Sequence, residues 1–293
     1  MPATSHPPIQ SDGLVDAHAH LTFAAHGVNP ARPGSAEIQE IFLRAQAAAG
    51  VTLVRDCGSL PHAEPSPSAP GLPCVISCGP LLAPDIPFLA HLREPVAAGD
   101  LIDLACQRVR RGASWIKLLA DAPGRDGNML AATPTYPLEL VTQLCAAVHQ
   151  LGGRVAAHTT GPAAPFLVDA GIDSIEHGGW LDNDAVARLG ARGGGWTPTL
   201  STALLHLQPM IDQGHPAASR LQRHLHDLAD TLSGAVAAGV VVMAGTDERA
   251  HGSVRHEAAL LHEYGFTSTD ATAAASHAAF KFLTNGNPRP AHA

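Results

Sequence analysis

The chain has 293 residues and a formal net charge of -8; 45% of its residues are hydrophobic and only 15% are charged. An acidic chain without a basic run lacks the positive surface that nucleic acid or an anionic membrane requires, so neither is an expected partner. No apolar stretch reaches the ~18 residues of a transmembrane helix, and the length suits a single large α/β domain.

The two ends of the chain differ from its middle in composition. Residues 1–13 contain neither the charged nor the apolar region of a signal peptide, so we expect a flexible lead-in. Residues 285–293 predict a flexible tail, which leaves residues 14–284 as one domain. The scattered, odd set of cysteines indicates reduced thiols, and the cytoplasm is the expected compartment. These cysteines are Cys57, Cys74, Cys78, Cys106 and Cys145.

From residue 14 onward, short apolar segments typical of strands alternate with segments of helical composition. Eight strands are predicted, at residues 14–21, 51–58, 73–81, 115–121, 154–160, 174–179, 194–200 and 240–248. Helices are predicted at residues 35–50, 93–112, 135–153, 181–194, 216–238, 253–264 and 269–283. Strands that alternate with helices and are buried on both faces indicate a parallel barrel or a doubly wound sheet.

Two local features refine this pattern. Ser35 is suited to cap the start of the first helix, and Gly50 is suited to end it. The Pro-rich residues 61–73 lie where a helix would be expected between the second and third strands. Their composition predicts a surface loop.

The first predicted strand carries two histidines separated by one residue. Because side chains alternate between the faces of a strand, His18 and His20 point the same way, together with Asp16. Two imidazoles on one face form a ready pair of metal ligands. The alternative is a chance pair in a chain that contains 18 histidines.

The fourth predicted strand contains one of only two lysines in the chain. Lys117 lies between Ile116 and Leu118, where burial would penalise a bare ammonium group. A neutral buried amine can react with carbon dioxide to form a carbamate, which is a carboxylate on a long arm that can bridge two metal ions. The alternative is a lysine that extends to solvent or pairs with Asp121.

Polar side chains also close three of the later strands. His158 and His177 end the fifth and sixth strands, and Asp247 follows the most hydrophobic strand of the chain. In a (β/α)8 barrel the active-site groups come from the carboxyl ends of several strands. Each residue alone is compatible with a structural role, such as a helix cap for Asp247. Together the strand ends predict a metal site formed by His18, His20, Lys117, His158, His177 and Asp247.

This combination resembles the amidohydrolase superfamily, which has His-x-His on strand one, lysine on strand four, histidines on strands five and six, and aspartate on strand eight. The chain resembles in particular the binuclear members with a carboxylated lysine, related to imidazolonepropionase or similar to prolidase. Shorter runs match too, namely VTLVRDCG, YPLEL, AAVHQLGGRVAAH, AGIDSIEHG, WTPTL and AGTDE.

The resemblance covers about residues 14–283 and implies a parallel, eight-stranded (β/α)8 TIM barrel of the α/β class. Most relatives of this type also have a small β-sandwich built from residues before the first strand and after the last helix. The short ends of this chain predict a barrel without that sandwich.

The resemblance implies that two divalent metal ions bind at the strand ends. His18, His20 and Asp247 would bind the more buried ion, and His158 and His177 the more exposed one. Carboxylated Lys117 and a hydroxide would bridge both ions. Asp247 would accept the proton of this nucleophile and pass it to the leaving group. The ligand set favours zinc, although ligands alone do not exclude other first-row metals.

Four further residues are candidates for contact with substrate. Arg55 and Asp56 close the second predicted strand, where a salt bridge inside the barrel mouth is the alternative. His251 lies in the loop after the last strand and is a candidate substrate contact or transition-state donor. Tyr136 is a candidate for lining the pocket, with packing as the alternative.

The implied reaction is hydrolysis of an amide-type C–N bond in a small molecule, such as a dipeptide, an N-acyl amino acid or a cyclic amide. A lactonase or phosphotriesterase with the same ligands is the alternative, and a metal-binding barrel without catalysis is a third. A deaminase is less consistent, because such enzymes pair one metal with a glutamate near the strand-five histidine, and Thr-Thr-Gly follows His158. The sequence leaves the substrate and homo-oligomerisation open.

Overall fold

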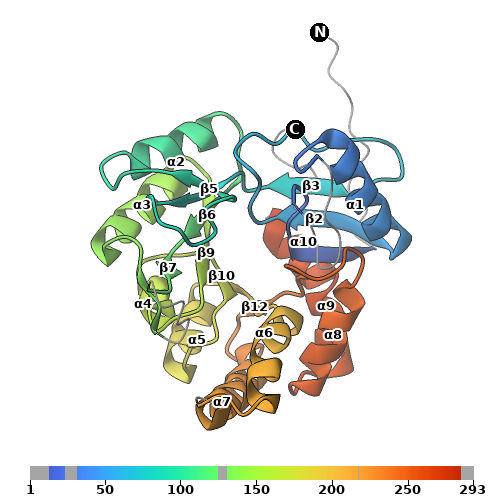
Figure 1. Cartoon of the computed structure of the whole chain (residues 1–293), viewed down its shortest axis with the longest axis vertical. Coiled ribbons are helices and arrows are strands. Elements are labelled where there is room, and N and C mark those ends of the chain that lie inside the picture. Colours follow the sequence, from blue (N-terminus) through green and yellow to red (C-terminus); the bar gives the residue numbers. More distant parts are fainter. Residues whose placement is uncertain (1–12, 24–31, 125–130, 217, 285–293) are drawn as a thin grey trace.

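The structure is a computed structural model that describes residues 13–23, 32–124, 131–216 and 218–284. The predicted tail (285–293) and all but the last residue of the predicted lead-in (1–13) lie outside these residues. Figure 1 shows an α/β fold in which strands surround the centre and helices lie around the outside. Among the residues that the structure describes, no helix is both long and apolar enough to cross a membrane.

The described strands form two parallel sheets and one small antiparallel pair. Their bounds are β1 Leu14–Ala19, β2 Val51–Asp56, β3 Cys74–Ser77, β4 Leu81–Ala83, β5 Arg93–Pro95, β6 Trp115–Leu119, β7 Asp121–Ala122, β8 Thr133–Pro134, β9 Arg154–Thr159, β10 Ser174–His177, β11 Gly195–Thr197 and β12 Val241–Val242. The larger sheet has the order β12-β11-β10-β9-β6-β4-β5, and the smaller one has the order β1-β2-β3. Strands β7 and β8 pair with each other.

The two parallel sheets meet where β1 approaches the segment that follows β12. The amide of Ala17 donates to the carbonyl of Ala244 (N···O 2.9 Å), and the amide of Asp247 donates to the carbonyl of His18 (2.6 Å). These bonds place the first predicted strand beside the last one, which is the neighbour relation expected in a (β/α)8 barrel.

The predicted third strand (73–81) is interrupted. Its first part, β3, pairs with β2, whereas its continuation, β4, pairs with β6. Between the two parts, Gly79 has a φ of +68°, and Pro80 has no N–H to donate to a neighbouring strand. The strands therefore follow barrel order, but they are divided between two sheets instead of forming the predicted single eight-stranded sheet.

The helices alternate with the strands along most of the chain. Their bounds are α1 Ala36–Ala48, α2 Leu101–Arg110, α3 Leu138–Gln150, α4 Ala164–Asp169, α5 Asn183–Ala191, α6 Leu200–Asp212, α7 Ala218–Ala235, α8 Val254–Glu263, α9 Ser268–Ala274 and α10 His277–Thr284. The predicted cap of α1 is confirmed, because the side chain of Ser35 accepts a backbone hydrogen bond from Ile38 (3.4 Å).

Three helical features differ from the prediction. Helices α4 and α6 were not predicted, and in α6 an internal proline, Pro209, obscures the helical pattern. Residues 93–95 form strand β5 instead of the start of a helix. The predicted helix over 269–283 is divided into α9 and α10, because the carbonyls of Ala274 and Ala275 accept hydrogen bonds from Ala244 (2.9 Å) and Val15 (2.8 Å).

The Pro-rich segment 61–73 is confirmed as a loop without helix or strand. It is attached to α1 through Gln39, whose amide donates to the carbonyl of Glu64 (2.8 Å) and accepts from Ser66 (2.7 Å). Apolar side chains from several strands pack together in the interior as one buried cluster, which includes Val15 and Met243. The carboxyl ends of the strands are therefore left as the place where polar side chains gather.

Candidate metal centre

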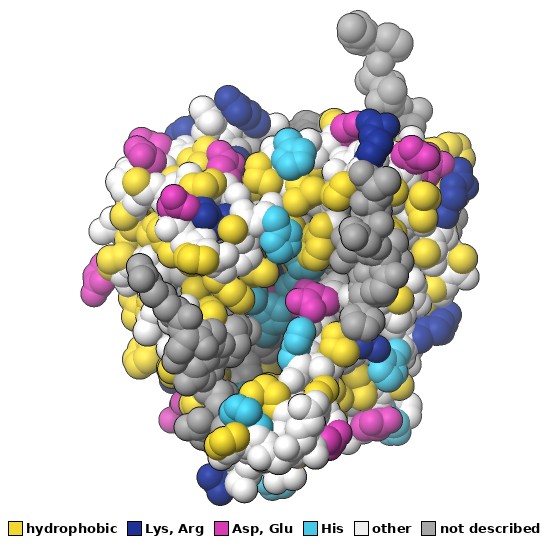
Figure 2. All heavy atoms as spheres, viewed as in Figure 1, with side chains coloured by type: hydrophobic (Ala, Val, Ile, Leu, Met, Phe, Trp, Pro, Cys, Tyr) yellow, Lys and Arg dark blue, Asp and Glu magenta, His cyan; other side chains and the backbone are white. Residues whose placement is uncertain are grey.

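The predicted ligands lie at or near the carboxyl ends of five strands. His18 is on β1 and His20 follows it directly; Lys117, His158 and His177 are on β6, β9 and β10, and Asp247 follows β12. Histidine side chains gather in a hollow in the middle of the face viewed in Figure 2.

His18, His20 and Asp247 form a buried group that can hold a metal ion. One ligand atom from each residue lies within 4.8 Å of the other two. Oδ1 of Asp247 is 3.2 Å from Nε2 of His20 and 3.6 Å from Nε2 of His18. The other ring nitrogen of His20 is 2.9 Å from the carbonyl oxygen of Gly58, which holds Nε2 toward Asp247. The structure thus brings together the three residues predicted for one ion.

The two remaining histidines join this group through the other oxygen of Asp247. Nδ1 of His177 lies 3.8 Å from Oδ2 of Asp247 and 2.7 Å from the hydroxyl of Thr199. Nε2 of His177 lies 2.9 Å from Nδ1 of His158. Nε2 of His158 is buried without a hydrogen-bond partner in the described part of the chain. The histidines predicted for the second ion therefore lie next to the first group.

Lys117 is buried, with 1% of its surface exposed, and its Nζ has no hydrogen-bond partner among the described residues. The alternative pairing with Asp121 is not formed. That carboxylate instead accepts hydrogen bonds from the hydroxyl of Thr159 and the amides of Thr160 and Gly161. A buried polar group without a partner is costly, so Lys117 is a candidate for a modification that supplies one.

Burial controls the protonation of these histidines. Burial, followed by the charges on Lys117 and His20, lowers the pKa of His158 to about 3. Burial, followed by neighbouring positive charges, also places the pKa of His18 and His177 well below the ordinary value. Burial acts in the same direction on His20, but the hydrogen bond and charge of Asp247, with contributions from Gly58 and Asp56, together raise the pKa of that residue. Neutral imidazole is the form that binds metal.

Backbone strain is concentrated at this site. Among the described non-glycine residues, four have φ between +48° and +68°, and three of them are His177, Thr199 and Asp247. Such conformations cost about 1–3 kcal/mol each and occur where a side chain must be aimed for function. Gly245 permits a further close approach, because a Cβ there would lie 2.5 Å from Cβ of His18.

Sequence reasoning missed the contacts that hold the ligands. Asp16 was expected only to share a face with His18, yet its carboxylate accepts from the amide (3.0 Å) and hydroxyl (2.6 Å) of Thr246, directly before Asp247. Thr199 contacts His177 although it follows a different strand, and its sequence context contains no signal of this. The alternation Asp-x-His-x-His was the only signal available for Asp16.

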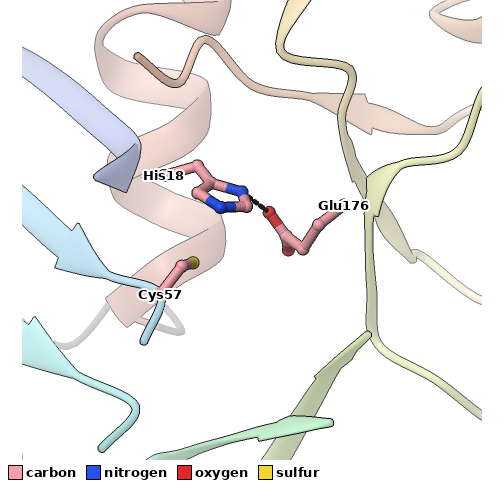
Figure 3. A group of neighbouring side chains, drawn as sticks. All are labelled: His18, Cys57 and Glu176. Atoms are coloured by element: carbon pink, nitrogen blue, oxygen red, sulfur yellow. Dashed lines mark hydrogen bonds and ion pairs between the residues drawn. The ribbon is translucent and has the colours of Figure 1, made fainter. Parts of the chain in front are cut away.

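Glu176 was also missed, although it directly precedes His177. Figure 3 shows its carboxylate turned toward the ring of His18, with Cys57 nearby; Oε2 lies 2.8 Å from Nδ1 of His18. These three side chains are spaced closely enough to hold a metal ion. However, burial raises the pKa of the Cys57 thiol well above its ordinary value, and Arg55 already pairs with Glu176 (2.7 Å). The cluster therefore supports His18 and does not form a second site.

The predicted substrate contacts have varied surroundings. Arg55 forms the buried ion pair that the sequence left open, and Asp56 is buried with its carboxylate 3.4 Å from the amide of Leu21. The hydroxyl of Tyr136 donates to the carbonyl of Val96 (2.8 Å). These internal contacts favour structural roles, and the role of each residue toward substrate stays a prediction.

His251 has a different environment. Its ring packs on Phe42, with centroids 4.3 Å apart, and its Nδ1 lies 3.5 Å from the amide nitrogen of Gln46. Its Nε2 is buried and has no hydrogen-bond partner in the described ranges. Burial, followed by the charge of His20, lowers the pKa of His251 to about 4. His251 is thus a neutral imidazole with one free nitrogen.

Several solved structures are similar to this fold. A Xaa-Pro dipeptidase with bound methionine matches with a TM-score of 0.70 and 21% identity, covering 92% of this chain and 75% of its own. An Aspergillus niger (A. niger) ochratoxinase has a TM-score of 0.72 and 21% identity, covering 92% and 71%. A prolidase complexed with N-methylphosphonate-L-proline has a TM-score of 0.68 and 20% identity, covering 93% and 74%.

One relative found by sequence has a higher identity to this chain than these solved structures have. A protein of Mycobacterium tuberculosis, which carries the name uncharacterized protein, is 32% identical over 282 residues, or 92% of this chain and 73% of the relative. The profile of the amidohydrolase family matches residues 13–285, so this chain belongs to the amidohydrolase family.

Proposed function

We propose that the protein is a binuclear metal-dependent hydrolase that cleaves an amide-type C–N bond in a small molecule. The observation that carries this proposal is the position of Asp247. Its two carboxylate oxygens face different histidines, with His20 at 3.2 Å from Oδ1 and His177 at 3.8 Å from Oδ2. One carboxylate is thereby suited to connect two adjacent ligand groups.

The residues fit two divalent cations. Histidine nitrogens and carboxylate oxygens are ligands that zinc and other first-row metals accept. Bound there, such cations would supply Lewis-acid polarisation of the scissile carbonyl and a water of lowered pKa. We assign His18, His20 and Asp247 to one ion and His158 and His177 to the other.

Lys117 is proposed to bridge the two ions as a carbamate. Its Nζ is buried without a partner in the described chain, next to histidines whose pKa values its charge lowers. Addition of carbon dioxide to the neutral amine, with loss of one proton, would convert a neutral group into an anion. That anion would complement two cations in the same space.

Asp247 is proposed to transfer the proton. Its backbone has a strained φ of +51° and is held by the hydrogen bond from its own amide to the carbonyl of His18 (2.6 Å). The carboxylate would accept a proton from the attacking water at one oxygen and deliver it to the departing nitrogen. His251, with its free Nε2, is proposed to contact the substrate at the edge of the site.

The substrate class is proposed as a dipeptide, an N-acyl amino acid or a cyclic amide. One of the similar structures is named a Xaa-Pro dipeptidase and another a prolidase, which favours a peptide-type amide. The test is a panel of dipeptides, N-acyl amino acids, cyclic amides, lactones and phosphotriesters, assayed with protein that holds two equivalents of zinc. Turnover of one of the amide classes is expected. Turnover confined to lactones or phosphotriesters would contradict the proposed bond type.

A further inference from the structure

The contact between Glu176 and His18 joins β10 to β1 across the interior of the fold. We propose that Glu176 is a positioning residue that determines which ring nitrogen of His18 faces the metal. This inference rests on the proposed role of His18 as a ligand. The predicted ligand set assigns no role to Glu176.

The contact is short and fully enclosed. Oε2 of Glu176 lies 2.8 Å from Nδ1 of His18, and the two side chains are 0% and 1% exposed. Figure 3 shows the carboxylate directed at the ring edge, with the opposite side of the ring turned away from Glu176. Water therefore does not compete for this position, and the partner of Nδ1 is set by Glu176 alone.

The orientation of the carboxylate is held by its second oxygen. Oε1 accepts hydrogen bonds from Nη2 of Arg55 (2.7 Å) and from the hydroxyl of Ser174 (2.6 Å). Arg55 is fixed in turn, because its Nε donates to the carbonyl of Ala17 (2.7 Å) and its guanidinium lies over the ring of Trp115 (4.8 Å). The two oxygens of Glu176 thus have separate and fixed partners.

These contacts determine the tautomer of His18. A carboxylate that is paired with a guanidinium can only accept, so Nδ1 of His18 must carry the ring proton. Nε2 then keeps its lone pair, and Nε2 is the nitrogen that lies 3.6 Å from Oδ1 of Asp247 within the candidate ligand group. A carboxylate behind a ligand histidine also makes that histidine a stronger ligand.

The substitution Glu176→Gln reverses this arrangement with little change in shape. The amide oxygen of glutamine must replace Oε1, because an NH2 group cannot accept from Arg55 and Ser174. The NH2 group then faces His18, whose Nδ1 has to become the acceptor. The ring proton moves to Nε2, where it blocks the lone pair that would bind metal.

The matched control is Ser174→Ala. It removes one hydrogen bond from the same carboxylate but leaves Arg55 on Oε1 and His18 on Oε2. Zinc dissociation constants of wild type and both variants would be measured by competition with a chromophoric chelator. We expect Glu176→Gln to weaken the binding of one ion by about 10–100-fold, and Ser174→Ala to change it much less.

The outcomes separate this inference from the proposed function. If wild type binds no zinc, the proposed function fails. If wild type binds zinc and Glu176→Gln binds it equally well, or Ser174→Ala weakens it as much, only the positioning role is overturned. Should Glu176→Gln fail to fold, the tautomer of His18 can be read from the ring ¹⁵N shifts of metal-free wild type. A proton on Nδ1 supports the inference, and a proton on Nε2 contradicts it.

Discussion

Nε2 of His20 lies 3.2 Å from Oδ1 of Asp247, although the two residues come from the first and the last strand regions of the chain. The hydrogen bond from the amide of Asp247 to the carbonyl of His18 joins the same two regions (2.6 Å). The seam between the two parallel sheets and the candidate metal centre are therefore built from the same residues. A change that disturbs one is expected to disturb the other.

Asp247→Asn tests the proposed proton transfer. The amide keeps the shape and one ligand oxygen but cannot accept a proton, so we expect turnover to fall by about 10²–10⁴-fold while the fold and much of the bound metal are retained. Glu248→Gln is the control, since Glu248 pairs with His206 outside the ligand group. Steady-state kinetics with metal analysis makes the measurement; an Asp247→Asn enzyme of full activity would refute the proton role.

Lys117→Ala tests the carbamate. Loss of the bridging anion should remove most of the activity, and short carboxylic acids supplied with zinc should restore part of it by occupying the space of the side chain. The other lysine of the chain, the exposed Lys281 of α10, provides the control Lys281→Ala. In wild type, ¹³C-labelled bicarbonate should give a carbamate signal in the carbon NMR spectrum that Lys117→Ala lacks. An unaffected Lys117→Ala enzyme would eliminate the bridging role.

The buried carboxyl group of Glu257 is expected to make the stability of the metal-free protein depend on pH. Its carboxylate accepts from the amides of Leu200 (2.5 Å) and Ser201 (3.0 Å) at the start of α6. Burial nevertheless raises the pKa of Glu257 from 4.5 to about 7. Between these values the native state holds more protons than the unfolded state, so stability is highest below the lower value and falls as pH rises through 7.

The measurement is the free energy of unfolding at pH 5 and pH 8. At about 1.4 kcal/mol per pKa unit, Glu257 accounts for a loss of at most about 3 kcal/mol. Glu257→Gln should lose less stability over this interval, and the exposed Glu263→Gln on the same helix should behave like wild type. An equal loss in Glu257→Gln and wild type would contradict the assignment.

Removal of metal should lower thermal stability. An ion that binds only the native state stabilises it by about 4 kcal/mol when its free concentration is 1,000 times its dissociation constant. We therefore expect a chelator to lower the melting temperature of wild type. Asp247→Ala should show a smaller shift, because one ligand of the His18 group is missing. Equal shifts in both proteins would indicate that metal binds elsewhere.

The rule that active-site residues lie at the carboxyl ends of barrel strands needs only the order of the strands, so it could be applied to the sequence alone. The resemblance based on His18, His20, Lys117, His158, His177 and Asp247 is confirmed at the level of the family. Burial of Lys117 also follows from its position between apolar neighbours, because both faces of such a strand are covered. Local patterns were sufficient for each of these predictions.

What could not be predicted depends on contacts between distant segments. The pairing of Glu176 with His18 requires the packing of β10 against β1 across the interior, and no pattern within either segment encodes it. The left-handed backbone at Thr199 is likewise unexpected, because a β-branched residue disfavours it and only the surrounding structure maintains it. The break between β3 and β4 has a local cause in Gly79 and Pro80, but the apolar residues on both sides made residues 73–81 resemble one continuous strand.

The number of metal ions per chain tests the central claim most directly. Protein depleted of metal, refilled with zinc and freed of excess by gel filtration would be analysed by mass spectrometry of the metal content. Two ligand groups connected through Asp247 predict close to two zinc ions per chain. Retention of no more than one ion by the folded wild-type protein would contradict a binuclear centre.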